Sequence, residues 1–129
     1  MNKSISGIVQ DGLGQGAGFT QLDWVRAQFR NKFGFDPHPG TLNVCVDDVE
    51  TLNAWRTQPG IGLEPTAGFC AARCYSIVLN DLIAGVWMIP EVPYYPMNLV
   101  EIMAAVSLRQ VLGVKSGDSL RIQMVEEIE

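Results

Sequence analysis

The chain has 129 residues, 47% of them hydrophobic, which is the size and composition of one globular domain with a packed core. Its formal net charge is −5, with nine lysines and arginines and no basic cluster, so the charge argues against a nucleic-acid partner. No apolar stretch is long enough for a signal peptide or a membrane span, and we therefore expect a cytoplasmic protein with no membrane partner, forming a single domain over residues 1–129.

A predicted strand and a glycine run open the chain. Residues 4–10 alternate loosely between polar and apolar types and carry isoleucine and valine, which predicts a strand. Every second residue from Gly12 to Gly18 is then glycine. Because glycine has no Cβ atom, such a run can take positive φ at several positions and turn successive N–H groups toward an anion. The run lacks the Lys-Ser or Lys-Thr pair of a Walker A loop, and it lacks the βαβ unit that follows a dinucleotide-binding glycine loop. The run therefore indicates either a phosphate site of another kind or a structural turn.

Residues 20–33 predict the main helix, with Thr20 as its N-cap and Gly34 as the residue that ends it. Several apolar side chains of this segment recur on one helical face, which predicts packing into the core. They are Leu22, Val25, Phe29 and Phe33. Residues 35–40 follow as a turn stiffened by two prolines.

Five further strands are predicted over residues 41–46, 68–79, 83–89, 99–104 and 119–125. Between them, residues 47–65 are expected to form a loop with one helical turn near residues 51–55, and residues 90–96 a loop stiffened by prolines. Ser107 begins a capping box and opens a short helix that ends near Gly113. About six strands, two helices and no βαβ repeat predict a mostly-β protein with appended helices, built as a small closed barrel.

The cysteines do not indicate a disulfide framework or a metal site. There are three of them, Cys45, Cys70 and Cys74, and an odd number in a chain of this size is not typical of a disulfide-stapled fold. A zinc site would need further ligands, and the single histidine is His38. We therefore expect three reduced, buried thiols.

Thr41 and Asn43 form a second candidate motif. They are two residues apart in a predicted strand, so their side chains share one face of it. A hydroxyl and an amide oxygen are hard, neutral ligands that can complete a Mg²⁺ octahedron together with phosphate oxygens and water. The alternative is that both side chains satisfy backbone groups beside a tight turn.

A set of motifs follows the order and approximate spacing of one family. These motifs are Gly7-Ile8-Val9, residues 12–16 with Phe19, Phe29, Gly34-Phe35, Pro37, residues 39–43, Pro90, Glu101-Ile102, Leu108-Arg109 and Gly117-Asp118. In them the chain resembles the CTP-dependent riboflavin kinases, the archaeal-type flavokinases. The resemblance covers most of the chain and is poorest over residues 47–68.

The resemblance implies a six-stranded cradle-loop, riboflavin-kinase-like β-barrel. It implies a phosphotransferase that moves the γ-phosphate of CTP to the 5′-hydroxyl of riboflavin, giving FMN and CDP. The residues that it implies line the nucleotide are Gly12, Leu13, Gly14, Gln15, Gly16, Ala17, Val106, Ser107, Leu108 and Arg109. By the same resemblance, Thr41 and Asn43 ligate Mg²⁺.

Pro93 and Glu101 are the residues that the resemblance places at the flavin. Glu101 is flanked by apolar residues and is the best candidate to orient or deprotonate the attacking hydroxyl. Four positions depart from the family pattern: Ala17 stands where a basic residue is usual, Gly18 and His38 where aromatic residues are usual, and Pro93 where a threonine is usual.

Two other functions fit the same barrel. The first alternative is a sensor domain that binds a cytidine nucleotide or a flavin without turnover. A DNA-binding regulatory barrel is disfavoured by the net charge and by the lack of a helix-turn-helix segment. No side chain is an evident reader of cytosine, and the sequence leaves the oligomeric state open.

Overall fold

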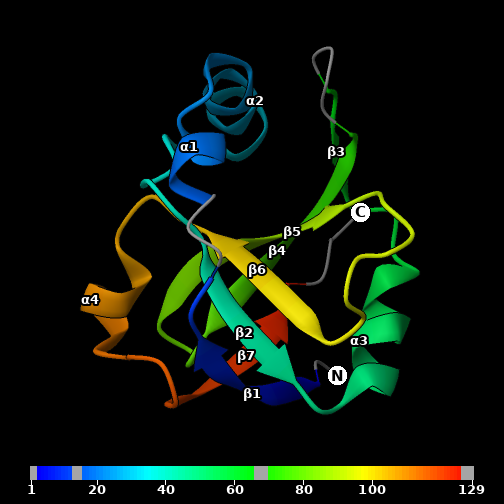
Figure 1. Ribbon diagram of the computed structural model, residues 1–129, viewed down its shortest axis with the longest axis vertical. Coiled ribbons are helices and arrows are strands. Elements are labelled where there is room, and N and C mark those ends of the chain that lie inside the picture. The colour runs from blue at the N-terminus through cyan, green and yellow to red at the C-terminus, as the bar shows by residue number, and fades with distance from the viewer. Residues whose placement is uncertain (1–2, 13–15, 66–69, 126–129) are drawn as a thin grey trace.

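The computed structural model of the chain describes residues 3–12, 16–65 and 70–125 (Figure 1). Its seven antiparallel strands follow the order β3-β4-β5-β6-β2-β1-β7, and β7 also pairs with β4. This last pairing closes every strand except β3 into a barrel, which confirms the expected six-stranded barrel. The strands are β1 Ser4–Gln10, β2 Leu42–Val46, β3 Ile61–Leu63, β4 Ala72–Leu79, β5 Ile83–Pro90, β6 Leu99–Met103 and β7 Ser119–Met124.

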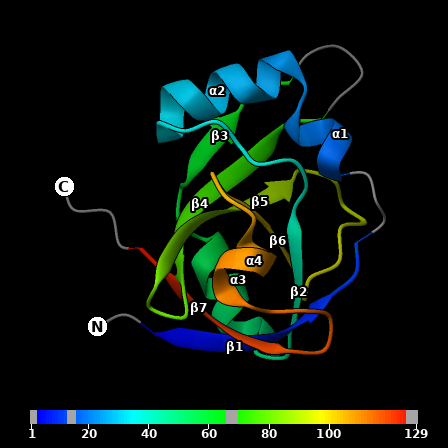
Figure 2. The same ribbon diagram turned by 90° about the vertical axis from the view of Figure 1, so that its left-hand side faces the viewer.

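In the described residues, four helices pack around the barrel: α1 Gly16–Thr20, α2 Asp23–Phe33, α3 Val49–Arg56 and α4 Leu108–Leu112. Helices α1 and α2 lie together above one end of the barrel, and α3 and α4 lie on opposite sides of it (Figures 1 and 2). No helix within the described ranges has the length and apolarity needed to cross a lipid bilayer.

The strand alternation separates two apolar cores. Side chains that point into the barrel, such as Ile77, Trp87 and Ile102, form the larger core and are almost completely buried. Helix α2 covers the outer face of β4, β5 and the end of β6, and its Val25 and Phe29 are both fully buried there. Burial of a side chain of this size stabilises a fold by roughly 1.5–3 kcal/mol. The predicted apolar face of α2 is therefore confirmed, and α2 is held firmly on the barrel.

The main helix begins three residues later than expected. Its N-cap is Leu22 rather than Thr20, because Thr20 ends α1 and its hydroxyl accepts a hydrogen bond from the Gly40 amide at 3.0 Å. The predicted end is confirmed, since Gly34 adopts φ of 79° and its N–H donates to the carbonyls of Arg30 and Phe29. The Thr20 hydroxyl, whose residue type suggested a local helix cap, is thus used instead in a long-range hydrogen bond with Gly40.

In the poorly matched segment, one helix is longer than expected and one strand was not expected. The single turn expected near residues 51–55 is a complete helix, α3, whose N-cap Asp48 accepts hydrogen bonds from the Thr51 amide at 3.0 Å and its hydroxyl at 2.7 Å. These bonds hold the pKa of the Asp48 carboxyl below its usual range. Strand β3, just beyond, has three residues and exists through its pairing with β4, so no local pattern announces it.

The three thiols differ in exposure, and the expectation that all are buried is wrong for two of them. Cys74 is fully buried under α2, whereas Cys45 is half-buried and Cys70 is exposed. Cys45 accepts a hydrogen bond from the Asn98 side chain. Burial raises the pKa of the Cys74 thiol to about 12, because the thiolate is poorly solvated there.

Alkylation should therefore discriminate sharply between Cys70 and Cys74. With iodoacetamide at pH 8, the thiolate fraction of Cys74 is of order 10⁻⁴ for a pKa near 12, and its sulfur is also shielded. We expect rapid labelling of Cys70 in the native protein and labelling of Cys74 only after addition of denaturant. Peptide mass mapping after timed quenching measures both sites, and equal native rates would contradict the described packing of α2.

Candidate functional site

Thr41 and Asn43 lie where β2 begins, with their side chains in contact. The Thr41 hydroxyl donates to the Asn43 side-chain oxygen at 3.1 Å, and Asn43 is only 8% exposed. Neighbouring ligand oxygens on an octahedral Mg²⁺ ion are about 3 Å apart, since each bond is about 2.0–2.1 Å long. The two oxygens therefore fit adjacent positions on such an ion. The pairing also shows that the two residues share a face, as the spacing predicted.

Glu101 lies directly opposite Asn43. Strands β2 and β6 pair with these two residues in register, so their side chains project on the same face. Side chains in this relation have Cβ atoms about 4.5–5.5 Å apart. On the other side of Glu101, β5 places Met88 in the same row, and Met88 belongs to the core under α2. One carboxylate thus stands between a pair of neutral oxygens and an apolar wall.

Tyr95 is a polar partner of this carboxylate that the sequence did not identify. Its hydroxyl donates to Glu101 Oε1 at 2.5 Å, and both residues are half-buried. Burial, together with the hydrogen bond and the charge of Glu101, raises the pKa of the Tyr95 hydroxyl far above its usual range. Tyr95 is therefore a neutral donor. Its only signal in the sequence is an aromatic residue in the proline-stiffened loop before β6.

Gly12 lies in close contact with the Asn43 side chain. A Cβ atom built on Gly12 would lie 2.3 Å from Asn43 Nδ2. Neither Gly12 nor Gly18 has positive φ, so these two positions do not use the left-handed backbone that a glycine run permits. An added side chain at residue 12 would therefore force the Asn43 side chain to shift, whereas the backbone conformation there does not itself favour glycine.

The second half of the glycine run is helical. A loop was expected here, but Gly16 and Ala17 form the first residues of α1. Leu13, Gly14 and Gln15 lie outside the described residues.

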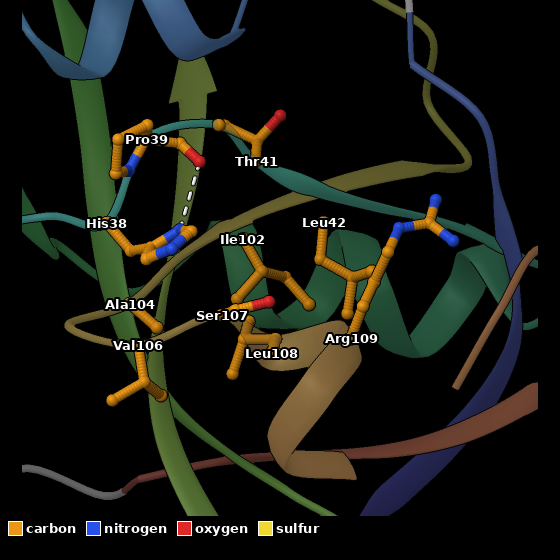
Figure 3. A pocket seen from close by; sticks show the side chains of 11 residues that line it. His38, Pro39, Thr41, Leu42, Ile102, Ala104, Val106, Ser107, Leu108 and Arg109 are labelled. Atoms are coloured by element: carbon orange, nitrogen blue, oxygen red, sulfur yellow. Dashed lines mark hydrogen bonds between the residues drawn. The ribbon is translucent and has the colours of Figure 1, made fainter. Parts of the chain in front are cut away.

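A cavity of about 150 Å³ connects the start of β2 with α4. Figure 3 shows Pro39 and Thr41 on one wall, Ser107 and Leu108 on the opposite wall, and Arg109 at the side. The structure thus brings one predicted metal ligand, Thr41, together with the four predicted nucleotide residues at the start of α4, Val106 to Arg109. The lining residues are His38, Pro39, Gly40, Thr41, Leu42, Ile102, Ala104, Val106, Ser107, Leu108 and Arg109.

The caps of α4 are those predicted from the sequence. Ser107 accepts from the Gln110 amide at 3.4 Å, and Gly113 ends the helix in the left-handed region. The Ser107 cap fixes the start of the helix, and Ser107, Leu108 and Arg109 line the cavity.

Arg109 reaches from α4 to the end of β1. Its Nη2 atom lies 3.7 Å from an Asp11 carboxylate oxygen and 3.4 Å from the carbonyl oxygen of Gln10, two residues before Gly12. The Asp11 side chain is 87% exposed, and ion pairs of this kind contribute little to stability. The Arg109 guanidinium is therefore able to exchange Asp11 for another anion at this end of the barrel.

Pro93 does not line the cavity with Thr41 and Arg109. It lines a second cavity of about 540 Å³, which Arg56, Arg73 and Tyr95 also line. Tyr95 is the link between this second cavity and Glu101, through its hydroxyl. The two residues predicted at the flavin are therefore connected, but through a third residue.

The described part of the chain contains no group of three or more histidine, cysteine, aspartate or glutamate side chains that could hold a metal ion. The candidate metal position offers two neutral protein oxygens, with one carboxylate in the next strand. Such a donor set suits a hard ion that takes most of its ligands from phosphate and water.

Comparison with known proteins gives concordant matches. A riboflavin kinase of Methanocella arvoryzae is 36% identical over 121 residues, which are 92% of this chain and 55% of that protein. One of Archaeoglobus fulgidus is 34% identical over 127 residues, 94% of this chain and 54% of the relative. The chain thus spans about half the length of these two curated relatives. A riboflavin kinase of Methanothermobacter thermautotrophicus is 32% identical over 116 residues, 90% of this chain and 94% of that protein.

A family model also matches residues 9–124; it is named CTP-dep_RFKase and described as a domain of unknown function, DUF120. This range includes the residues that the structure brings together around β2 and α4, from Gly12 to Arg109. Because the model covers nearly the whole chain and the relative that this chain spans almost completely agrees with it, the chain belongs to the CTP-dep_RFKase family.

Proposed function

We propose that this chain is a riboflavin kinase that transfers the γ-phosphate of CTP to the 5′-hydroxyl of riboflavin, giving FMN and CDP. The observation that carries the proposal is the juxtaposition of Thr41, Asn43 and Glu101 at the start of β2. Two neutral oxygens suited to a phosphate-bound cation stand beside one carboxylate suited to a hydroxyl. The names of the relatives and of the family support the same reaction.

The nucleotide would occupy the cavity between β2 and α4. The base and ribose lie against Val106, Ser107 and Leu108, and the phosphates extend toward Gly12 and Arg109. The remaining residues of the glycine run, Leu13, Gly14, Gln15, Gly16 and Ala17, belong to the proposed nucleotide site on the strength of the family resemblance. Arg109 is the side-chain cation in this arrangement, and it releases Asp11 when phosphate binds.

Thr41 and Asn43 would hold Mg²⁺ through their side-chain oxygens. When bound there, the ion neutralises charge on the phosphate oxygens, as in other phosphoryl-transfer sites. The protein contributes the 3.1 Å spacing of the two oxygens and the burial of Asn43, which restrict both side chains before any ligand arrives.

Glu101 acts on the acceptor. Its carboxylate accepts the proton of the riboflavin 5′-hydroxyl as that oxygen forms its bond to the γ-phosphorus and the bond to the CDP oxygen breaks. Pro93 contacts the flavin from the second cavity, whose volume of about 540 Å³ suits a planar ring and whose walls are part apolar and part charged.

The test is an FMN assay with a choice of donors. Purified protein is incubated with riboflavin, Mg²⁺ and one of CTP, ATP, GTP or UTP, and flavins are separated by chromatography. We expect FMN and CDP with CTP, and no FMN when Mg²⁺ is removed with a chelator. Binding of CTP without FMN from any donor would instead support a sensor domain, and neither binding nor product would contradict both functions.

A further inference from the structure

Among the described residues, Tyr95 is the one hydrogen-bond partner of the Glu101 side chain. The tyrosine has a single O–H donor, and that donor is directed at Oε1 at a distance of 2.5 Å. A carboxylate has two oxygens that can accept protons. With Oε1 occupied, Oε2 is the oxygen left for an incoming hydroxyl group.

The Tyr95 hydroxyl is itself held in place. Its ring packs against the core inside the barrel, and its amide donates to the Val92 carbonyl at 3.3 Å. The loop is bounded by Pro90 and Pro96, whose rings restrict φ. A second turn follows, in which the Leu99 amide donates to the Pro96 carbonyl at 3.4 Å. The donor aimed at Glu101 is therefore fixed by a core contact and a stiffened loop.

The cationic groups nearby are engaged elsewhere. Arg56 of α3 donates to the Met97 carbonyl at 2.9 Å, and its guanidinium lies over the Trp87 ring. Arg73 of β4 is 3.5 Å from Glu91 beside the second cavity. No ion pair of Glu101 occurs within the described ranges, so these cations do not set the direction of its carboxylate.

We propose that Tyr95 is a positioning residue, which orients the Glu101 carboxylate so that Oε2 faces the acceptor hydroxyl. This inference rests on the proposed function. A glutamate on a strand has three rotatable side-chain bonds, and without a fixed partner its carboxylate samples several directions. Proton transfer requires heavy atoms within about 2.6–3.2 Å of each other, so unproductive directions reduce the rate in proportion to their population.

The test is Tyr95→Phe, which keeps the ring in the core and removes the hydroxyl alone. We expect kcat for FMN formation to fall about tenfold, while KM for riboflavin and for CTP stays within twofold. A purely structural role for the ring would leave kcat unchanged in this variant. The matched control is Tyr94→Phe, since Tyr94 is 83% exposed, and we expect wild-type kinetics from it.

A double variant tests whether Tyr95 affects kcat through the Glu101 carboxylate. In a Glu101→Gln background, Tyr95→Phe should change kcat by less than twofold, because a glutamine cannot take the proton whichever way it points. An additive loss in the double variant, or an unchanged kcat in Tyr95→Phe with an active wild-type protein, overturns the positioning role alone. A wild-type protein that forms no FMN overturns the proposed function, and the positioning role with it.

Discussion

Glu101→Gln is expected to lower kcat for FMN formation by about 10²–10³-fold. General base catalysis by a placed side chain is typically worth 10²–10⁴-fold, and the amide has the shape of the carboxylate without its basicity. The substituted amide oxygen would still accept the Tyr95 hydrogen bond, so the local structure stays intact. Steady-state kinetics with saturating CTP and Mg²⁺ give kcat, and thermal unfolding verifies that the midpoint is unchanged.

The matched control for this substitution is Glu50→Gln. Glu50 is exposed in the first turn of α3, so the variant makes the same change of charge outside the site. We expect its kcat to be that of the wild type. Near-normal turnover by Glu101→Gln would show that this carboxylate is not the base, and the orientation of the 5′-hydroxyl would then have to come from other groups.

Gly12→Ala should damage the site through Asn43. The new methyl group would lie 2.3 Å from Asn43 Nδ2, far inside contact distance, so the Asn43 amide has to move. Asn43 is buried and accepts the Thr41 hydrogen bond, and its displacement separates the two oxygens proposed to hold Mg²⁺. A shift of about 1 Å in such a group can cost about 10²-fold in rate.

The measurement is kcat/KM as a function of Mg²⁺ concentration. We expect Gly12→Ala to lose about 10²-fold at low Mg²⁺ and to need a higher concentration for half-maximal rate. Gly18→Ala serves as the control within the same glycine run, because an added Cβ meets no atom within 4 Å there. Alanine also favours the helix in which residue 18 lies, so stability should be equal or higher. A Gly12→Ala variant with the Mg²⁺ dependence of the wild type would argue against Asn43 as a ligand.

Local signals in the chain predicted the elements that local interactions stabilise. Gly34 and Gly113 end helices in the left-handed conformation, and Ser107 caps α4, all as their residue types indicated. Thr20 carries the same kind of signal, yet its hydroxyl is bonded to Gly40, and the helix begins at Asp23 instead. Strand β3 forms only because β4 lies beside it. A propensity is a weak preference, and a tertiary hydrogen bond outweighs it.

The candidate site divides in the same way. The mostly-β class, the shared face of Thr41 and Asn43, and the family resemblance that selected Glu101 all follow from the order of residues in the chain. The folded arrangement was needed to show that Glu101 lies opposite Asn43, that Tyr95 donates a hydrogen bond to Glu101, and that Gly12 lies against the Asn43 side chain. The register between β2 and β6 follows from barrel closure and from the alternation that buries one face of each strand. These constraints act between segments far apart in the chain, so no local pattern of residues encodes them.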